Sequence, residues 1–312
     1  METGLIASRF LHYVAAMALF GVSLFPLYAF AYRRPQWSMR LQRLLRAIVL
    51  AAAVAALLSS ITWLAFTTAM MAGTLSAATE WDAVWSVLSD TTFGHVWIVR
   101  LALMIVILSA TRFGAASTAN GHRDIHTPLL AGLLLASLAG VGHTQQNDGP
   151  AWLVHSGADS VHLLAAGAWL GGLLILGFVL VPSRASPACD PRVTEDVLLR
   201  FSGMGYIAVA LLIASGAVNS WYLIGSVDAL VGTAYGQLLL VKLCLFTSML
   251  ALAASNRFWL VPALRNSETA RSHDSLATLR RHVLGEEVLG LFVILIVSAL
   301  GTMEPAGSQM AP

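Results

Sequence analysis

Residues 142–180 read GHTQQNDGPAWLVHSGADSVHLLAAGAWLGGLLILGFVL, and the rest of the chain is organised around this segment. One apolar segment ends at His143, a short polar turn follows, and a second segment begins with His155, Asp159 and His162. These three side chains have the spacing i, i+4 and i+7, so they share one face of a helix. The apolar run behind them is long enough to cross a bilayer. Because ionisable groups are costly inside a membrane, this face is a candidate functional site.

The composition of the whole chain indicates an integral membrane protein. Of its 312 residues, 57% are hydrophobic and 11% are charged, and the mean hydropathy is +0.75, whereas a soluble domain carries roughly 25% charged residues. The two cysteines, Cys189 and Cys244, form no CxxC pair, so neither a disulfide framework nor a thiolate metal site is indicated. There is no GxxxxGK[ST] loop for a nucleotide, which excludes an ATP-driven pump. The arginines follow a membrane topology and do not indicate nucleic-acid binding.

Apolar segments of spanning length occur eight times, which predicts an all-α polytopic membrane protein with eight transmembrane helices. The loops after the odd-numbered helices carry arginines, and those after the even-numbered helices carry acids. Cytoplasmic loops are enriched in Lys and Arg, so both termini are expected outside the cytoplasm. The predicted spans are residues 5–32, 44–72, 94–113, 127–144, 153–181, 200–224, 235–260 and 283–303.

The two halves of the chain are similar to each other. TTFGHVWIVRL at 91–101 matches TAYGQLLLVKL at 233–243, and HYVAA at 12–16 matches HLLAA at 162–166. Both matches keep the order and direction of the helices. We therefore predict a parallel repeat of four plus four helices, related by an axis along the membrane normal.

This repeat gives a domain organisation and a geometry. The first four helices occupy residues 1–150 and the last four occupy residues 151–312. His12 and His162 are then equivalent in depth, on the outer side of the membrane. Because equivalent helices beside a two-fold axis face one another, these two histidines are expected to approach each other near the axis.

Six segments of the chain carry a family resemblance. They are RFLHYVAAMALFG (9–21), TTFGHVWIVRL (91–101), ADSVHLLAAGAWLGGL (158–173), TAYGQLLLVKLCLF (233–246), NRFWLVPAL (256–264) and LGTMEPA (300–306). In these segments the chain resembles the CopD family of bacterial inner-membrane copper-resistance proteins, and the CopD-like block covers 200–303.

The resemblance implies eight helices, a role in copper homeostasis, and movement of copper across the inner membrane. It supplies no settled set of ligands. In an inner membrane, the arginine distribution places both termini in the periplasm. The chain lacks a methionine-rich extension, so capture of copper is expected to need a periplasmic copper-binding partner.

Histidines on the outer side, together with one aspartate, are the candidate copper ligands. Imidazole suits both Cu(I) and Cu(II), and a carboxylate offsets the charge of a metal ion in an apolar environment. The aspartate fits either a direct ligand or a partner that orients a histidine. Each histidine also fits a packing or solvated polar group, as at position 95, where the repeat has Gln237. The candidates are His12, His95, His143, His155, Asp159 and His162.

Several other polar groups lie in or near the spans. Arg100 and Lys242 occupy equivalent repeat positions and are expected to pair with a carboxylate or with carbonyl groups. Glu286 and Glu287 fit either a release or proton site, or acids that open a helix at its positive end. Residues 80–88 have the helical spacing of a short amphipathic helix on the outer membrane surface.

Three functions are compatible with these features. The first is a copper-binding or copper-transport protein, without enzymatic activity, whose ligands lie at the outer face and whose path runs between the two repeats. The second is an electron-transfer protein that holds haem between His12 and His162. The third is an accessory subunit that only docks a periplasmic copper chaperone.

Overall fold

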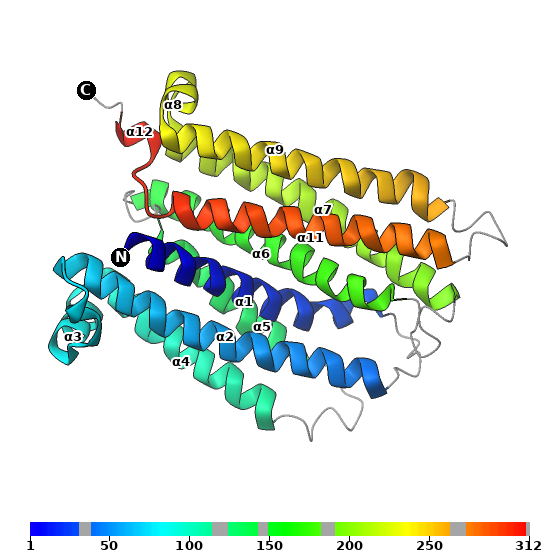
Figure 1. Cartoon of the computed structure of the whole chain (residues 1–312), viewed down its shortest axis with the longest axis horizontal. Helices are drawn as coiled ribbons and strands as arrows, with labels where there is room; N and C mark the ends of the chain where they lie inside the picture. Colours follow the sequence, from blue (N-terminus) through cyan, green and yellow to red (C-terminus); the bar gives the residue numbers. More distant parts are fainter. Residues whose placement is uncertain (31–38, 114–123, 143–148, 182–190, 263–272, 310–312) are drawn as a thin grey trace.

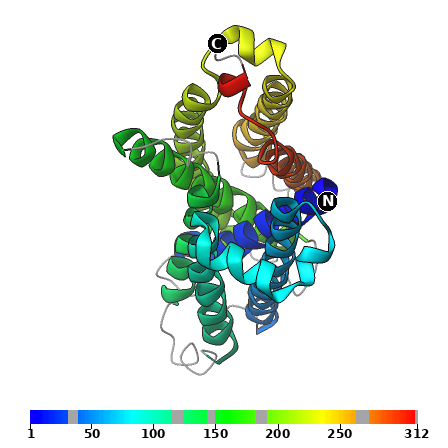
Figure 2. The same ribbon diagram turned by 90° about the vertical axis from the view of Figure 1, so that its left-hand side faces the viewer.

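The structure is a computed structural model that describes residues 1–30, 39–113, 124–142, 149–181, 191–262 and 273–309. Within these ranges all regular structure is helical, as predicted. The long helices lie side by side along the long axis of the molecule (Figure 1). The short helices α3, α8 and α12 lie at the end that holds the N-terminus, which faces the viewer in Figure 2. The elements are α1 (Glu2–Ala29), α2 (Met39–Ala72), η1 (Ser76–Thr79), α3 (Trp81–Asp90), α4 (Thr92–Phe113), α5 (His126–Ala136), η4 (Ser137–Val141), α6 (Gly149–Val179), α7 (Pro191–Ile224), α8 (Val227–Gly232), α9 (Ala234–Ser255), the π-helical turn η7 (Asn256–Leu260), α11 (His273–Leu300) and α12 (Ala306–Gln309).

Seven described helices are long and apolar enough to cross a membrane, which makes this an all-helical, multi-pass membrane protein. They are α1, α2, α4, α6, α7, α9 with η7, and α11. The predicted span 127–144 is the shorter helix α5, continued by η4. Two starts were predicted too late, because α7 and α11 each begin with polar turns that precede the apolar run. The predicted surface helix at 80–88 is α3.

The outside of the bundle is apolar between its two ends. Large side chains such as Ile61, Val99, Ile207 and Phe292 are exposed on α2, α4, α7 and α11. In water such a surface would favour aggregation, but the acyl chains of a bilayer cover it without cost. The exposed apolar surface therefore agrees with a position inside a membrane.

Helices α1 and α6 form the centre of the bundle. Helix α1 packs against α2, α5, α6, α7 and α11, and α6 packs against α1, α5, α7 and α11. The two central helices touch at Gly21 and Gly171, where a Cβ on Gly21 would lie 2.1 Å from the carbonyl oxygen of Gly167. A Cβ on Gly171 would lie 2.5 Å from the Cα of Gly21. Only glycine allows two helix backbones to approach this closely.

The turn from α3 into α4 has the same contacts as the turn from α8 into α9. The hydroxyl of Thr91 accepts a hydrogen bond from the N–H of Gly94 at 2.9 Å, and that of Thr233 accepts one from Gly236 at 3.0 Å. Each threonine also donates to the carbonyl four residues before it, at 2.6 Å and 2.7 Å. In both turns the glycine packs directly on the preceding short helix. The two turns have the same local structure, and the arrangement of the whole chain as a 4+4 repeat stays a prediction.

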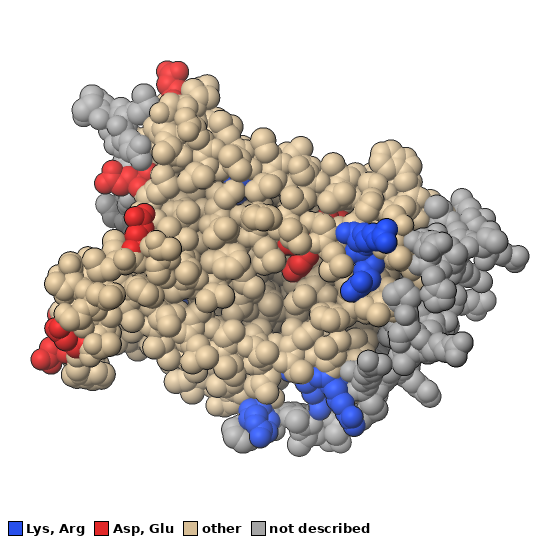
Figure 3. All heavy atoms as spheres, viewed as in Figure 1, with Lys and Arg blue, Asp and Glu red and all other residues tan. Residues whose placement is uncertain are grey.

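Charged residues separate between the two ends of the bundle. In the face that Figure 3 shows, most acidic side chains lie at the end with the N-terminus, and the arginines lie towards the opposite end. The described acids of the first end are Glu2, Glu80, Asp82, Asp90, Asp228 and Glu304, and described arginines at the opposite helix ends include Arg43, Arg46, Arg112, Arg257, Arg280 and Arg281. We call these the acidic end and the basic end.

Candidate functional site

His12 is completely buried between α1, α2 and α4. Its Nδ1 lies 3.1 Å from the backbone oxygen of Ala56 and 3.1 Å from Oγ of Ser59. Its Nε2 lies 2.6 Å from a terminal nitrogen of Arg100. A guanidinium group can only donate, so Nε2 is the acceptor and Nδ1 carries the proton that is donated to α2. Both ring nitrogens of His12 are therefore used inside the protein.

Arg100 is also completely buried and links three helices of the first half. One terminal nitrogen donates to the backbone oxygen of Leu134 at 2.7 Å and to the hydroxyl of Ser137, and the other donates to His12. The guanidinium carbon lies 5.2 Å from the centre of the Trp97 ring, within the range of a cation–π contact. The predicted pairing of Arg100 with a carbonyl group is confirmed.

The predicted polar face of α6 packs against α7. His155, Asp159 and His162 follow one another along this face from the acidic end inwards, and each has a partner on α7. The rings of His155 and Tyr222 are stacked at 4.7 Å, Asn219 donates to a carboxylate oxygen of Asp159 at 3.1 Å, and Nδ1 of His162 lies 3.0 Å from the hydroxyl of Ser215.

The contacts of His162 define its protonation state. The hydroxyl of Ser215 donates to the backbone oxygen of Leu211, so it accepts the proton on Nδ1 of His162. His162 is therefore the same tautomer as His12, with an unprotonated Nε2. In the described part of the chain no hydrogen bond involves that Nε2. His162 thus offers a lone pair where His12 has none to offer.

Lys242 of α9 faces the same region. It is close enough to Asp159 and His162 to interact electrostatically with both. In the aligned segments it stands where the first half has Arg100. Among the described residues no hydrogen bond joins Lys242 to His162. The second half therefore combines an open imidazole nitrogen, a carboxylate and an ammonium group, where the first half has a closed arginine–histidine pair.

The comparisons with known proteins point to one family. Residues 1–154 match the family described as copper resistance protein D-like, N-terminal domain, and residues 195–300 match the family described as copper resistance protein D. The chain is 33% identical to copper resistance protein D of Pseudomonas syringae pv. tomato, over 96% of each chain. It belongs to the copper resistance protein D family.

Two other relatives of this copper resistance family extend the comparison. The inner membrane protein YebZ of Escherichia coli (strain K12) is 33% identical, over 96% of this chain and 98% of the relative. The copper transport protein CutJ of Bacillus subtilis (strain 168) is 29% identical over this whole chain, which covers 54% of the longer relative. No solved structure matches the chain. These names describe copper resistance, copper transport and an inner membrane protein, and none describes an enzymatic reaction.

The structure separates the copper ligands that were predicted for this family member. His12 faces α2 and α4, whereas His155, Asp159 and His162 face α7. His143 lies outside the described residues. Within the residues that are described, no three His, Cys, Asp or Glu side chains are arranged to hold a metal ion. The predicted set of copper ligands stays a prediction.

His95 has a contact that accounts for it without a metal. Its Nε2 lies 2.8 Å from the backbone oxygen of Ser89, near the end of α3. Gln237 makes the equivalent contact in the second half, where its amide donates to the backbone oxygen of Val231 at 3.3 Å. An imidazole and an amide can both donate to a carbonyl, so these residues connect each short helix to the span that follows it.

Sequence reasoning missed the polar groups on α2 and α7. Ser59, Ser215 and Asn219 are single polar residues in long apolar segments, and such residues often bond only to their own helix. Aligning the second helix of each half, AALLSSITW (55–63) with LLIASGAVN (211–219), would have paired Ser59 with Ser215. That pairing places a hydroxyl next to each matched histidine of the predicted repeat, His12 and His162.

Proposed function

We propose that this protein binds copper in its second half, at Nε2 of His162 with Asp159 and His155 on the same face of α6, and moves it across the inner membrane. The observation that carries the proposal is the difference between two matched histidines. Both donate from Nδ1 to a serine, but Arg100 occupies Nε2 only in His12. The copper-related names of the relatives support the choice of metal.

The chemistry of this face suits a copper ion. Imidazole nitrogen binds Cu(I) and Cu(II), and the hydrogen bond from Nδ1 to Ser215 orients the ring as a supporting partner of a metal ligand does. Without copper, Lys242 supplies a positive charge near Asp159. An arriving copper ion would take over that role, so the buried carboxylate would stay neutralised in both states.

His12 has a structural role in this proposal. Its buried ring is enclosed by Trp63 and Trp97, with ring centres at 5.5 Å and 5.9 Å, and Arg100 occupies its remaining nitrogen. The same contacts leave His12 without a nitrogen for an axial bond to iron. Nothing in the comparisons or in the described contacts supports the haem alternative.

We further propose that the chain is a parallel 4+4 repeat whose halves are residues 1–150 and 151–312, and that they have diverged in function. The equivalent turns at Thr91 and Thr233 and the matched histidines support this repeat. Because Gly21 and Gly171 bring α1 and α6 into backbone contact, a path between the halves is closed at that depth. We therefore place the copper path inside the second half, among α6, α7, α9 and α11, with a periplasmic copper-binding protein as the donor.

The proposed orientation puts the acidic end in the periplasm. Arginine-rich loops remain in the cytoplasm during insertion, and the basic end carries Arg112, Arg257 and Arg280. A reporter fused after Gly149 should be active only in the periplasm, and one fused after Pro35 only in the cytoplasm. The reverse pattern of reporter activity would place the α6 face on the cytoplasmic side. Copper could then not enter this face from the periplasm, and the proposal would be wrong.

Replacing His162 tests the binding site. His162→Ala should lower the affinity of the purified protein for copper by about 10–100-fold, because it removes the open nitrogen. His126→Ala is the matched control, since His126 is exposed at the basic end and should leave the affinity unchanged. Isothermal titration of the detergent-solubilised variants with copper measures both. Equal affinities of the two variants would show that His162 is only a packing group.

A further inference from the structure

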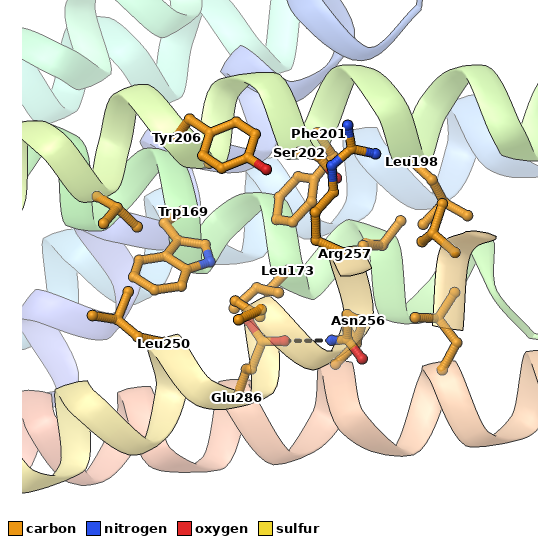
Figure 4. Close-up of a pocket in the computed structure, with 18 of the residues that line it drawn as sticks. Trp169, Leu173, Leu198, Phe201, Ser202, Tyr206, Leu250, Asn256, Arg257 and Glu286 are labelled. Atoms are coloured by element: carbon orange, nitrogen blue, oxygen red, sulfur yellow. Dashed lines mark hydrogen bonds between the residues drawn. The ribbon is translucent and has the colours of Figure 1, made fainter. Parts of the chain in front are cut away.

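A cavity of about 290 Å³ lies in the second half, towards the basic end from His162. It is lined by α6, α7, α9 with η7, and α11, and most of its lining is aliphatic or aromatic (Figure 4). Trp169, two turns beyond His162 on α6, lines its side nearest the acidic end. An ion that leaves the α6 face towards the basic end would therefore enter this cavity next.

One carboxyl group points into this apolar cavity. Glu286 of α11 is only 2% exposed, and the amide of Asn256 donates to one of its oxygens at 2.7 Å (Figure 4). Its neighbour Glu287 has a buried oxygen without a hydrogen-bond partner in the described structure. A single amide donor does not replace the hydration of a carboxylate, so a bare negative charge is expensive here.

Asn256 also contacts a second titratable group, His282. Its side-chain oxygen lies 3.0 Å from Nδ1 of His282, which is half-buried one turn nearer the basic end of α11. Asn256 starts η7, and single π turns inside α-helices occur often at functional sites. The result is a chain in which His282 donates to Asn256 and Asn256 donates to Glu286.

The charged groups around Glu286 leave it without a cation partner. Arg257 lines the same cavity from η7, but no ion pair joins it to Glu286 among the described residues. Glu287 and His282 are the titratable neighbours on α11 itself, and α6 and α7 contribute Trp169, Ser202 and Tyr206 to the lining and no carboxylate or ammonium group. Binding a proton therefore neutralises the carboxylate of Glu286.

We propose that Glu286 is a proton-binding site on the cytoplasmic side of the copper path, and that copper entering the cavity exchanges with its proton. In this step the O–H bond of Glu286 breaks, the proton passes to water at the half-exposed His282 end, and the carboxylate neutralises one charge of the copper ion. Asn256 is a positioning residue that holds the carboxyl group and the imidazole in place. The coupling to copper rests on the function proposed above, whereas the protonated state of Glu286 does not.

The protonated carboxyl group is tested without copper. Infrared spectra of the purified protein at neutral pH should contain the carbonyl band of a buried protonated carboxyl group, and Glu286→Gln should remove it. Glutamine keeps the oxygen that accepts from Asn256, so the fold is expected to survive. Glu287→Gln is the matched control and should keep the Glu286 band. A spectrum that Glu286→Gln leaves unchanged, or a band lost only in Glu287→Gln, overturns the assignment.

The exchange is tested in proteoliposomes that enclose a pH-sensitive dye. Addition of copper should change the internal pH with the wild-type protein. Glu286→Gln should lower the initial rate of that change by at least about tenfold, whereas Glu287→Gln should stay within about twofold of the wild-type rate. His162→Ala should lose both the flux and the affinity. A wild-type protein that binds no copper refutes the proposed function and leaves the infrared result standing. Glu286→Gln with a wild-type proton flux refutes the exchange itself.

Discussion

Lys242→Arg is expected to lower copper affinity by about 10–100-fold, although it conserves the positive charge. In the first half an arginine at the equivalent position donates to Nε2 of its histidine at 2.6 Å. A guanidinium group at position 242 should reach Nε2 of His162 in the same way and occupy the lone pair that copper needs. The ammonium group of Lys242 lacks the planar set of donors of a guanidinium group and leaves Nε2 of His162 without a hydrogen bond.

Copper titration of the purified variant measures this effect, and circular dichroism confirms that the helices are intact. Lys242→Met is the companion variant, because it removes the charge without supplying a blocking group. It should bind copper more tightly than Lys242→Arg. Wild-type affinity in Lys242→Arg would mean that Nε2 of His162 is not a copper ligand, and the site would have to be sought elsewhere on the α6 face.

The second large effect concerns stability. Arg100→Met should destabilise the protein severely, because it leaves Nε2 of His12 without its buried donor and removes the hydrogen bonds that tie α4 to Leu134 and Ser137. The hydroxyl of Ser137 still donates to the backbone oxygen of Leu134 at 2.8 Å, so the main loss is at His12. A buried polar group that loses its only partner costs about 1–3 kcal/mol. Thermal unfolding in detergent should show a large fall in Tm.

Lys242→Met provides the matched control for stability. It removes a cation from the equivalent position, but within the described residues no hydrogen bond depends on that cation. Its Tm should fall much less than that of Arg100→Met. Equal losses of stability would show that the two positions have the same structural role, and the proposed division between a structural first half and a binding second half would be wrong.

The positions of the spans could be predicted from hydropathy because the bilayer sets their length. Seven of the eight predicted spans are long apolar helices, the eighth is the shorter α5 with η4, and the acidic segment after α2 forms the helix α3. The starts of α7 and α11 were missed because the polar turns at the basic end lie outside the apolar run. Hydropathy records the thickness of the hydrocarbon layer, and a helix can extend beyond it.

The partners of the site residues were harder to predict. The shared face of His155, Asp159 and His162 follows from helical spacing alone. Which nitrogen of a histidine is free depends on tertiary contacts, and the decisive ones come from Ser215 and Arg100 on other helices. His12 and His162 look equivalent in the sequence, but Arg100 donates to Nε2 of His12, whereas no described hydrogen bond joins Lys242 to His162. A guanidinium group and an ammonium group are not interchangeable at such a position.

The glycine contact at the centre of the bundle also has an electrical consequence. Moving one charge through a membrane potential of 100 mV releases about 2.3 kcal/mol, so an ion leak between the two halves would dissipate the energy that the cell stores in this potential. Where Gly21 and Gly171 meet, the backbones of α1 and α6 touch and no side chain separates them. At this depth the contact between the two halves is thus closed by the main chain itself. A larger residue at either position would separate the two helices and let water enter between them. Glycine at positions 21 and 171 therefore keeps ions from leaking through the protein along this helix contact.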